Sequence, residues 1–376
     1  MSARGRSLVY AVAAVFCAGL IAFAAHAVKN RRGHSGDASS PVAVAADGGV
    51  RIGEPIVLED LTLFPIFSAT QTDPGPMTTL AAALGAGAAE VREVGAEEAA
   101  PSSSRHTRHG RERSGPVVNT LVIANHGDKA IYVLAGTVVK GGNQDRQIAQ
   151  DFVVAARTTV PVDAFCVEQG RWTGEREGVG TQGKFEAVEA LANSKVRAAG
   201  QYESSQGEVW AEVAKVNSAH GKQKASGTLM ATLDDAEVKA AREGLSKRIS
   251  QALGKARPSD ELVGMAYAVN GQVRGVRWFA SHELFELFQG TLANTAASDA
   301  LTARGGAAPK PAPPMVAADV GGFMREIDRA KAEEKNTSAG NVNAYKKAKA
   351  GYGSSTTYKP SPAKAAVPLS SDYVAK

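Results

Sequence analysis

Two short clusters of polar residues carry the side chains of this chain that are best suited to chemistry. The first cluster spans residues 141–146, and the second spans residues 166–172. Guanidinium groups bind phosphate and carboxylate through paired hydrogen bonds, carboxylates can act as general bases or orient a hydroxyl, and an indole offers a stacking surface. The candidate ligand-binding residues are therefore Gln144, Asp145, Arg146, Glu168, Gln169, Arg171 and Trp172.

Each of these side chains also has a purely structural interpretation. The acidic and basic members of each cluster can form ion pairs that close the ends of a sheet, and Gln144 and Gln169 can satisfy exposed strand amides. The binding interpretation requires the two clusters to meet, which a strand-turn-strand arrangement would achieve because both clusters lie at strand ends. The pair Gly141-Gly142 is consistent with the binding interpretation, since glycine tolerates positive φ and lets backbone amides approach a ligand. Both interpretations stay open at this point.

Cys166 is the only cysteine outside the N-terminal apolar segment. A nucleophilic thiol needs a neighbouring histidine and an acid, and none of His126, His220 and His282 lies in a sequence context typical of such a partner. Cys166 shares the apolar face of its predicted strand, which favours a buried, inert thiol. The sequence also lacks a phosphate-binding glycine loop, a dinucleotide fingerprint, a Gly-x-Ser-x-Gly elbow and zinc-ligand spacing. We therefore assign no catalytic residue, no metal and no cofactor.

Strands must position the two clusters, because the region around them alternates between apolar and polar residues. The predicted strands at residues 120–124 and 130–134, joined by a turn at residues 125–128, are expected to form a hairpin. In the predicted strand at residues 160–166, alternation places Val160, Val162, Ala164 and Cys166 on one face. The predicted strands are Thr120–Ala124, Ala130–Leu134, residues 148–154 and Val160–Cys166.

Other local signals place a strand before this region and helices after it. Residues Leu61–Phe67 predict an early strand that Pro65 restricts to an edge or a bent position. Asn270-Gly271 between two apolar alternating runs is the preferred turn of a type I′ hairpin. We predict a single α+β domain over residues 53–301, rich in antiparallel strands, with helices mainly in the C-terminal half. Helix caps are predicted at Thr78 or Thr79, Ser205, Asp234 or Asp235, and Ser281.

The ends of the chain differ in composition from this domain. Residues 8–28 form an apolar run preceded by two arginines, so residues 1–28 are predicted to be a signal peptide or a membrane anchor. Export, with an extracytoplasmic body, is the expectation, and an anchor with a cytoplasmic body is the alternative. Residues 29–52 are predicted to be a flexible linker, residues 96–116 a mobile basic insertion, and residues 302–376 a disordered tail rich in Ala, Pro and Lys.

The net charge of +5 is concentrated at the ends of the chain. Residues 1–27 carry +2 and residues 302–376 carry +6, which leaves −3 on residues 28–301. Nucleic-acid binding requires a basic face on the folded part of a protein. We therefore predict no nucleic-acid partner for the folded domain.

The two clusters together resemble a family signature. Residues 141–146 read Gly-Gly-Asn-Gln-Asp-Arg, and residues 166–172 read Cys-Val-Glu-Gln-Gly-Arg-Trp. They resemble the ARG (ADP-ribosylglycohydrolase) and rhodanese-phosphatase superfamily-associated protein domain family, in which a Gly-Gly-Lys-Gln-Asn-Arg-like string precedes a Val-Glu-Gln-Gly-Arg-Trp-like string. The first string departs from the family pattern at Asn143 and Asp145, and the second is intact. The likeness extends over residues 53–301.

The resemblance implies a connection with ADP-ribose and NAD-related metabolism. It predicts a module that binds or processes an ADP-ribose-like or phosphate-bearing small molecule through the candidate residues. The alternative is a non-enzymatic cell-envelope module that binds another protein or a polymer, and the predicted export and low-complexity tail favour it. Contact with a membrane through residues 8–28 is expected if this segment is not cleaved.

Overall fold

The computed structural model describes residues 42–43, 49–93, 120–176, 178–181, 183–360 and 365–376. The apolar run at residues 8–28 and the insertion at residues 96–116 lie outside this part of the chain, so what was predicted for them stays a prediction. Within the described ranges, no helix is both long and apolar enough to cross a membrane. The α+β class and the many antiparallel strands are confirmed.

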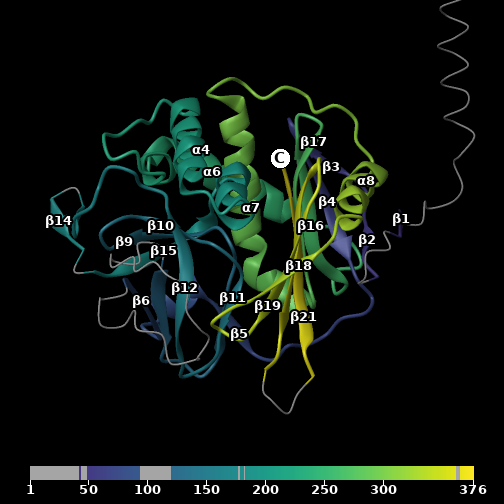
Figure 1. The fold of residues 1–376 in the computed structure, drawn as a ribbon. Helices are drawn as coiled ribbons and strands as arrows, with labels where there is room; N and C mark the ends of the chain where they lie inside the picture. The colour runs from purple at the N-terminus through teal and green to yellow at the C-terminus, as the bar shows by residue number, and fades with distance from the viewer. Residues whose placement is uncertain (1–41, 44–48, 94–119, 177, 182, 361–364) are drawn as a thin grey trace, which may run out of the picture. The chain divides into compact units, whose positions relative to one another are not determined.

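A ten-stranded sheet forms one layer of the domain (Figure 1). Its strands follow the order β1-β2-β4-β16-β17-β21-β20-β19-β18, and β3 pairs with β4. The predicted hairpin of β16 and β17 lies at the centre of this sheet. It turns as expected, because Asn270 and Gly271 adopt the positive φ angles, 52° and 75°, of a type I′ turn. The strands are β1 Val42–Ala43, β2 Arg51–Ile52, β3 Ile56–Leu58, β4 Leu61–Phe67, β16 Leu262–Val269, β17 Gln272–Phe279, β18 Glu333–Asn336, β19 Val342–Lys347, β20 Gly351–Tyr358 and β21 Val367–Ala375.

The folded domain begins before the predicted boundary at Gly53. β2 lies inside the segment predicted to be a linker and pairs with the end of β4. β4 pairs with β16 on one side and with β2 and β3 on the other, so it is not an edge strand. Pro65 lies opposite the interval between β3 and β2, where its missing N–H removes no ladder hydrogen bond.

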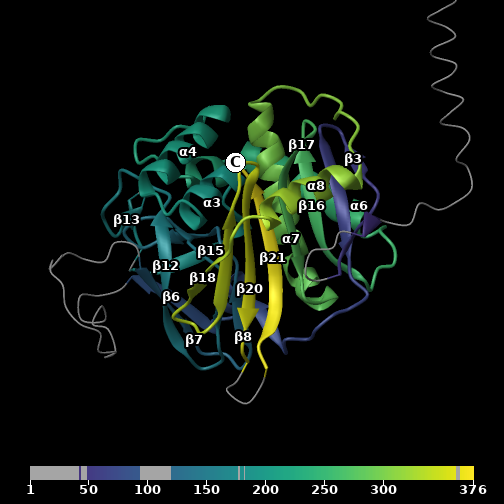
Figure 2. The ribbon, with the colours of Figure 1, turned by 45° about the vertical axis from the view of Figure 1, so that its right-hand side comes forward.

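The C-terminal residues form an inner part of this sheet. β21 lies between β17 and β20, and helix α8 (Ala317–Asp328) covers one face (Figure 2). The prediction of a disordered tail at residues 302–376 is therefore wrong for the described residues. It failed because the glycines that resemble a low-complexity composition are packing requirements here: a Cβ on Gly351 would lie 2.4 Å from the carbonyl oxygen of Val374.

The second layer is a six-stranded antiparallel sheet of order β15-β9-β10-β12-β7-β6. A bridge between Arg92 and Lys184 joins its two edges, so the sheet curls around an apolar core. A three-stranded sheet, β11-β8-β5, contributes to the same core, and β13 and β14 form a small hairpin. The strands are β5 Met77–Thr79, β6 Ala89–Glu93, β7 Thr120–Asn125, β8 Ala130–Val133, β9 Thr137–Gly141, β10 Arg146–Ile148, β11 Phe152–Val154, β12 Thr159–Cys166, β13 Glu175–Arg176, β14 Val179–Gly180 and β15 Phe185–Leu191.

The hairpin predicted from residues 120–134 does not form. β7 pairs with β6 and β12, whereas β8 pairs with β11 and, in parallel, with β5. The side-chain amide of Asn125 donates to the carbonyl oxygens of Lys129, Val154 and Ala155, so the turn directs the chain out of one sheet and into another. The third predicted strand is likewise divided, into β10 and β11.

Helices cover both faces of the ten-stranded sheet. Side chains that alternate along β4 show this: Leu63 packs in one apolar cluster with α6 and α7, and Phe64 packs in another with α8. The caps predicted at Thr79, Ser205, Asp235 and Ser281 are confirmed, each side chain accepting a backbone N–H of the first turn. The remaining helices are α2 Leu80–Gly85, α3 Ser194–Gln201, α4 Gln206–Ala219, α5 Met230–Leu233, α6 Ala236–Leu253 and α7 His282–Arg304.

Four buried charges join the C-terminal strands to the rest of the core. Arg277 donates to Asp372 at 3.1 Å and to Asp151 at 3.2 Å, and Arg197 donates to Asp372 at 2.7 Å. Burial raises the pKa of Asp372, but the two guanidinium groups more than offset it and lower the pKa to about 2. Because a buried charge is costly without its partner, this network requires β21 to be in place.

Candidate functional site

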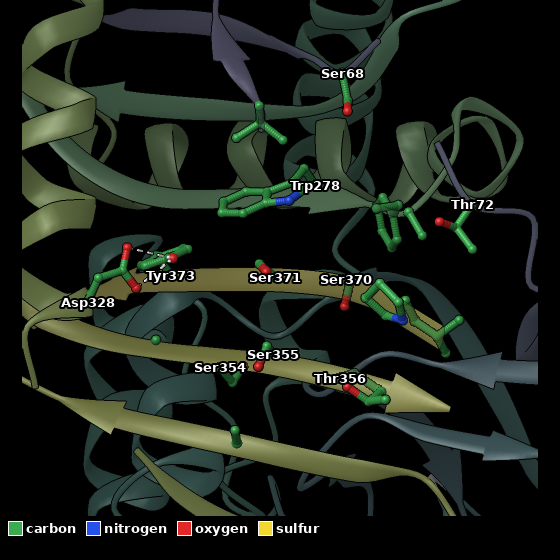
Figure 3. Close-up of a pocket in the computed structure, with 18 of the residues that line it drawn as sticks. Ser68, Thr72, Trp278, Asp328, Ser354, Ser355, Thr356, Ser370, Ser371 and Tyr373 are labelled. Atoms are coloured by element: carbon green, nitrogen blue, oxygen red, sulfur yellow. Dashed lines mark hydrogen bonds between the residues drawn. The ribbon is translucent and has the colours of Figure 1, made fainter. Parts of the chain in front are cut away.

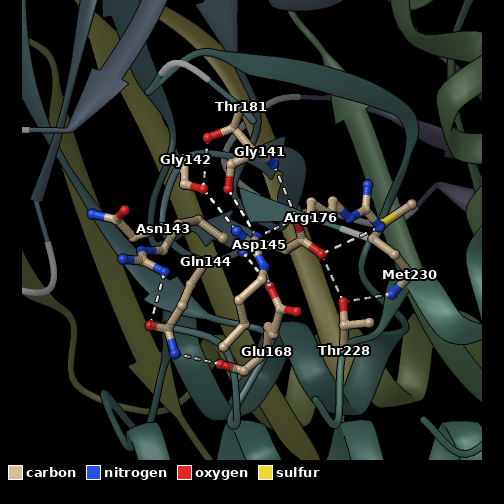
Figure 4. A network of polar contacts seen from close by, with 12 residues as sticks. Gly141, Gly142, Asn143, Gln144, Asp145, Glu168, Arg176, Thr181, Thr228 and Met230 are labelled. Carbon is tan, nitrogen blue, oxygen red and sulfur yellow. Dashed lines mark hydrogen bonds and ion pairs between the residues drawn. The ribbon is translucent and has the colours of Figure 1, made fainter. Parts of the chain in front are cut away.

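The two polar clusters meet at one end of the six-stranded sheet, where its inner strands β10 and β12 begin and end (Figure 4). β10 and β12 are antiparallel, with Arg146 opposite Cys166, so the loop that precedes β10 and the loop that follows β12 leave the sheet side by side. The strand-end argument from the sequence therefore describes the geometry correctly. The structure brings together the side chains of Gln144, Asp145, Arg146, Glu168 and Arg171, and it leaves Gln169 and Trp172 exposed.

The glycine pair gives the first loop its shape. Gly141 and Gly142 adopt φ angles of 136° and 46°, which L side chains rarely reach. A Cβ on Gly141 would lie 2.1 Å from the carbonyl oxygen of Lys184, and a Cβ on Gly142 would lie 2.2 Å from the ring of Phe185. The tight loop directs both glycine carbonyls to the guanidinium group of Arg171 rather than directing backbone amides to an open site.

Arg171 connects the two loops. Its Nη1 donates to the carbonyl oxygens of Gly142 at 2.7 Å and Thr173 at 2.9 Å, and its Nη2 donates to that of Gly141 at 3.1 Å. Its Nε donates to Glu168 at 2.9 Å. The five N–H groups of a guanidinium are thereby committed within the protein. In this structure Arg171 is a clamp between the loops, which is the structural interpretation left open above.

The buried carboxylates of Asp145 and Glu168 complete the connection. Asp145 accepts from the backbone N–H of Gly141 at 3.0 Å and from the hydroxyl of Thr228 at 2.7 Å. Glu168 accepts from the backbone N–H of Asp145 at 3.1 Å. Burial raises the pKa of Asp145, although the Thr228 hydroxyl and the nearby Arg176 guanidinium act in the opposite direction. The carboxyl of Asp145 has no accessible surface, so it supports the site from beneath.

Gln144 and Arg146 lie on the other side of the same loop. The Gln144 amide donates to the carbonyl oxygen of Glu168 at 3.0 Å and accepts from Arg146 Nη1 at 3.1 Å. Arg146 Nη2 lies 3.5 Å from Glu93, while its Nε has no partner among the described residues. Glu93 also accepts from the side chain and the backbone of Asn143. These contacts fix the loop to β6, an attachment that the sequence did not indicate.

The outer surface of the site carries two cations that the sequence reasoning missed. Arg176 Nη2 lies 3.6 Å from Asp145 and 3.5 Å from Asp234. Lys140 Nζ lies 3.7 Å from Glu186 and 3.8 Å from the other oxygen of Asp234. Trp172, which lies shortly before Arg176 in the sequence, is 54% exposed. Arg176 and Lys140 are therefore loosely paired cations above a buried acidic layer.

Cys166 is buried, as predicted from its strand face. Burial raises the pKa of its thiol. Its backbone N–H and carbonyl are both bonded by the side chain of Gln206, which attaches α4 to the end of β12. The geometry gives Cys166 a packing role.

Comparison with known proteins identifies one family. The family model of the ARG and Rhodanese-Phosphatase-superfamily-associated Protein domain matches residues 49–366. This span includes both polar clusters and reaches into the C-terminal strands. No protein of curated function matches the chain significantly, and no solved structure does.

Proposed function

The chain belongs to the ARG and Rhodanese-Phosphatase-superfamily-associated Protein domain family, and on that premise we propose that its domain binds a phosphate-bearing ligand of the ADP-ribose class. The proposed site is the surface outside Asp145, formed by Arg176, Lys140 and Trp172. The clamp of Arg171 and the two buried carboxylates form a rigid floor beneath it.

The observation that carries this proposal is the state of Arg176. Its side chain is 21% exposed, and its two ionic contacts, at 3.5 and 3.6 Å, lie beyond ordinary hydrogen-bond length. Within the described part of the chain, none of its N–H groups donates a hydrogen bond. A phosphate would supply short, charge-assisted hydrogen bonds that the present partners do not supply.

Asp234 provides the place for an incoming anion. It is the carboxylate that Arg176 and Lys140 share, and its side chain is exposed. A phosphate that displaced Asp234 would keep both cations neutralised, and Asp234 would be solvated again at little cost. Lys140 would then add a second positive charge to the phosphate site.

Trp172 supplies the second part of the proposed site. The indole of Trp172 is 54% exposed and presents an aromatic face to the solvent. Stacking of a base on an aromatic side chain contributes about 1–3 kcal/mol. The exposed side chain of Gln169 lies on the same loop and offers both a donor and an acceptor. The arrangement supports ligand binding rather than catalysis, because the carboxylates that could act as general bases, Asp145 and Glu168, are buried.

Isothermal titration calorimetry of the full chain tests the proposal, with ADP-ribose, ribose 5-phosphate and adenosine as ligands. Arg176→Gln should weaken ADP-ribose binding about 10- to 100-fold, the value of a charge-assisted hydrogen bond. Arg274→Gln, which removes another partly exposed arginine, is the matched control and should bind normally. Trp172→Ala should weaken binding of ADP-ribose and leave ribose 5-phosphate unchanged.

Arg171→Ala is not a suitable test, because loss of the clamp would disturb both loops whether or not a ligand binds. If Arg176→Gln binds ADP-ribose as tightly as the wild type, the proposed site is wrong. Absence of binding for all three ligands at millimolar concentration would reject the proposed function.

A further inference from the structure

A cavity of about 360 Å³ lies against the ten-stranded sheet, away from the two polar clusters (Figure 3). Its floor is a row of residues that are neighbours across four strands. Trp278 on β17 is paired with Ser371 on β21, which is paired with Ser355 on β20, and Ser355 is paired with Ala344 on β19. A cavity of this volume falls within the range of small-molecule sites.

The position of α8 leaves this row open. The next row on the same face contains Tyr373 and Gly353, and a Cβ on Gly353 would lie 2.8 Å from Ile327 of α8. Helix and sheet are therefore in direct contact at that row. One row further along, small side chains replace this contact, and the cavity begins at Ser355 and Ser371.

Three polar groups on the floor are available to a ligand. The hydroxyls of Ser355 and Ser371 make no hydrogen bond to any residue that the structure describes. The same holds for the indole Nε1 of Trp278, although only 7% of this residue is exposed. An acceptor placed in the cavity would form a hydrogen bond with this donor, which the described residues leave without a partner. The floor thus offers one fixed donor and two hydroxyls that can donate or accept.

The charges in the cavity wall compensate each other. Lys346 Nζ lies 3.0 Å from Asp328, which also accepts from the hydroxyl of Tyr373 at 2.9 Å. The wall therefore provides no free charge for an anion, in contrast to the surface around Arg176. Pro368 adds apolar surface beside the hydroxyls. A ligand that matches both features is uncharged and alternates C–H surface with hydroxyl groups.

We propose that this cavity binds a neutral sugar, such as a pyranose residue or a disaccharide, through Trp278 Nε1 and the hydroxyls of Ser355 and Ser371. A pyranose ring presents both C–H faces and hydroxyls that can accept from the indole and exchange hydrogen bonds with serine. This site is separate from the proposed phosphate site, and either can fail without the other.

Fluorescence of Trp278 gives a direct readout of occupancy. The full chain with Trp172→Phe and Trp210→Phe retains Trp278 as its only tryptophan. The change at Trp210 removes a buried Nε1 that has no partner among the described residues, so the fold should tolerate it. Titration with glucose, N-acetylglucosamine and their β-1,4-linked disaccharides should give a saturable change in Trp278 emission for at least one sugar.

The same titration on Ser355→Ala and Ser371→Ala should show affinity lowered about fivefold for each lost hydrogen bond. Ser218→Ala, an exposed serine of α4, is the matched control and should bind as the parent does. The proposal is overturned if no sugar changes the emission up to solubility, or if both serine variants bind like the control. It is also overturned if glucose 6-phosphate binds as well as glucose, because the cavity wall should reject the charge.

Discussion

Replacement of Asp372 by Asn tests the buried ionic network that joins β21 to the core. The substitution keeps the shape of the side chain and removes its charge. Arg197 Nη1 and Arg277 Nε donate to the two carboxylate oxygens, at 2.7 and 3.1 Å, and all three side chains are buried. Arg277 would keep Asp151 as a partner, but the described structure gives Arg197 no second carboxylate.

The expected cost is large, because a buried guanidinium would lose its counter-charge. Removal of one partner from a buried ion pair typically costs about 3–5 kcal/mol, a large share of the ordinary stability of a domain, about 5–15 kcal/mol. The lowered pKa of Asp372 gives an independent value for the electrostatic part of this cost. A carboxyl whose pKa falls from 3.8 to about 2 on folding contributes about 2 kcal/mol through its charge alone.

The pKa also fixes the direction of the pH dependence. Because the folded pKa of Asp372 lies below the unfolded value, its contribution is complete above pH 4 and is lost as the pH falls toward 2. Urea unfolding of wild type and Asp372→Asn should therefore differ by at least about 3 kcal/mol at pH 7. The difference should shrink by about 2 kcal/mol between pH 4 and pH 2.

Glu243→Gln is the matched control, since Glu243 pairs with Lys239 on the exposed surface of α6. Its effect should stay below about 0.5 kcal/mol at any pH. A cost below about 1 kcal/mol for Asp372→Asn, or a cost that does not change with pH, would refute the reasoning about the network.

Three further outcomes are expected from the fold and the site. Deletion of residues 317–376 should abolish cooperative unfolding in urea, because it removes four strands and exposes Arg277. A truncated chain with an unchanged urea midpoint would contradict the account of the C-terminal strands. Gly141→Ala should lower the free energy of unfolding by about 2 kcal/mol or more, because the φ of residue 141 is 136° and the added Cβ would meet a carbonyl oxygen. Urea titration measures this loss, and a neutral effect would show that the loop can adopt another shape. In a Cys17→Ser background, Cys166 should react with a thiol reagent only in denaturant, and rapid reaction of the folded chain would show that its burial is transient.

Elements with a local chemical signal were predictable from the sequence. The Asn270-Gly271 hairpin and the helix caps at Ser205, Asp235 and Ser281 formed as expected, because the turn or cap is determined by the residues themselves. The predicted hairpin after Thr120 failed for a reason that a local pattern does not contain. The Asn125 amide binds carbonyl oxygens 29 and 30 residues further along the chain, and these contacts separate the two strands.

Composition was misleading at the C-terminus. Glycine, serine and alanine are frequent in disordered segments, and they are also what a closely packed strand pair requires, as at Gly351 and Gly353. The meeting of the two polar clusters was predictable, because strand ends bring neighbouring loops together. Thr228 was not predictable as a partner of Asp145, since it lies 83 residues away and carries no spacing signal. Arg176 was missed because its hairpin, rather than a conspicuous motif, places it above Asp145.

Saturation-transfer difference NMR of ADP-ribose with the full chain tests the proposed function most directly. It reports which protons of the ligand contact the protein. We expect the strongest saturation on the adenine protons, because Trp172 is the exposed stacking surface, and loss of that saturation in Trp172→Ala. Saturation that is absent in the wild type, or unchanged in Trp172→Ala, would contradict the proposal that this surface binds the ligand.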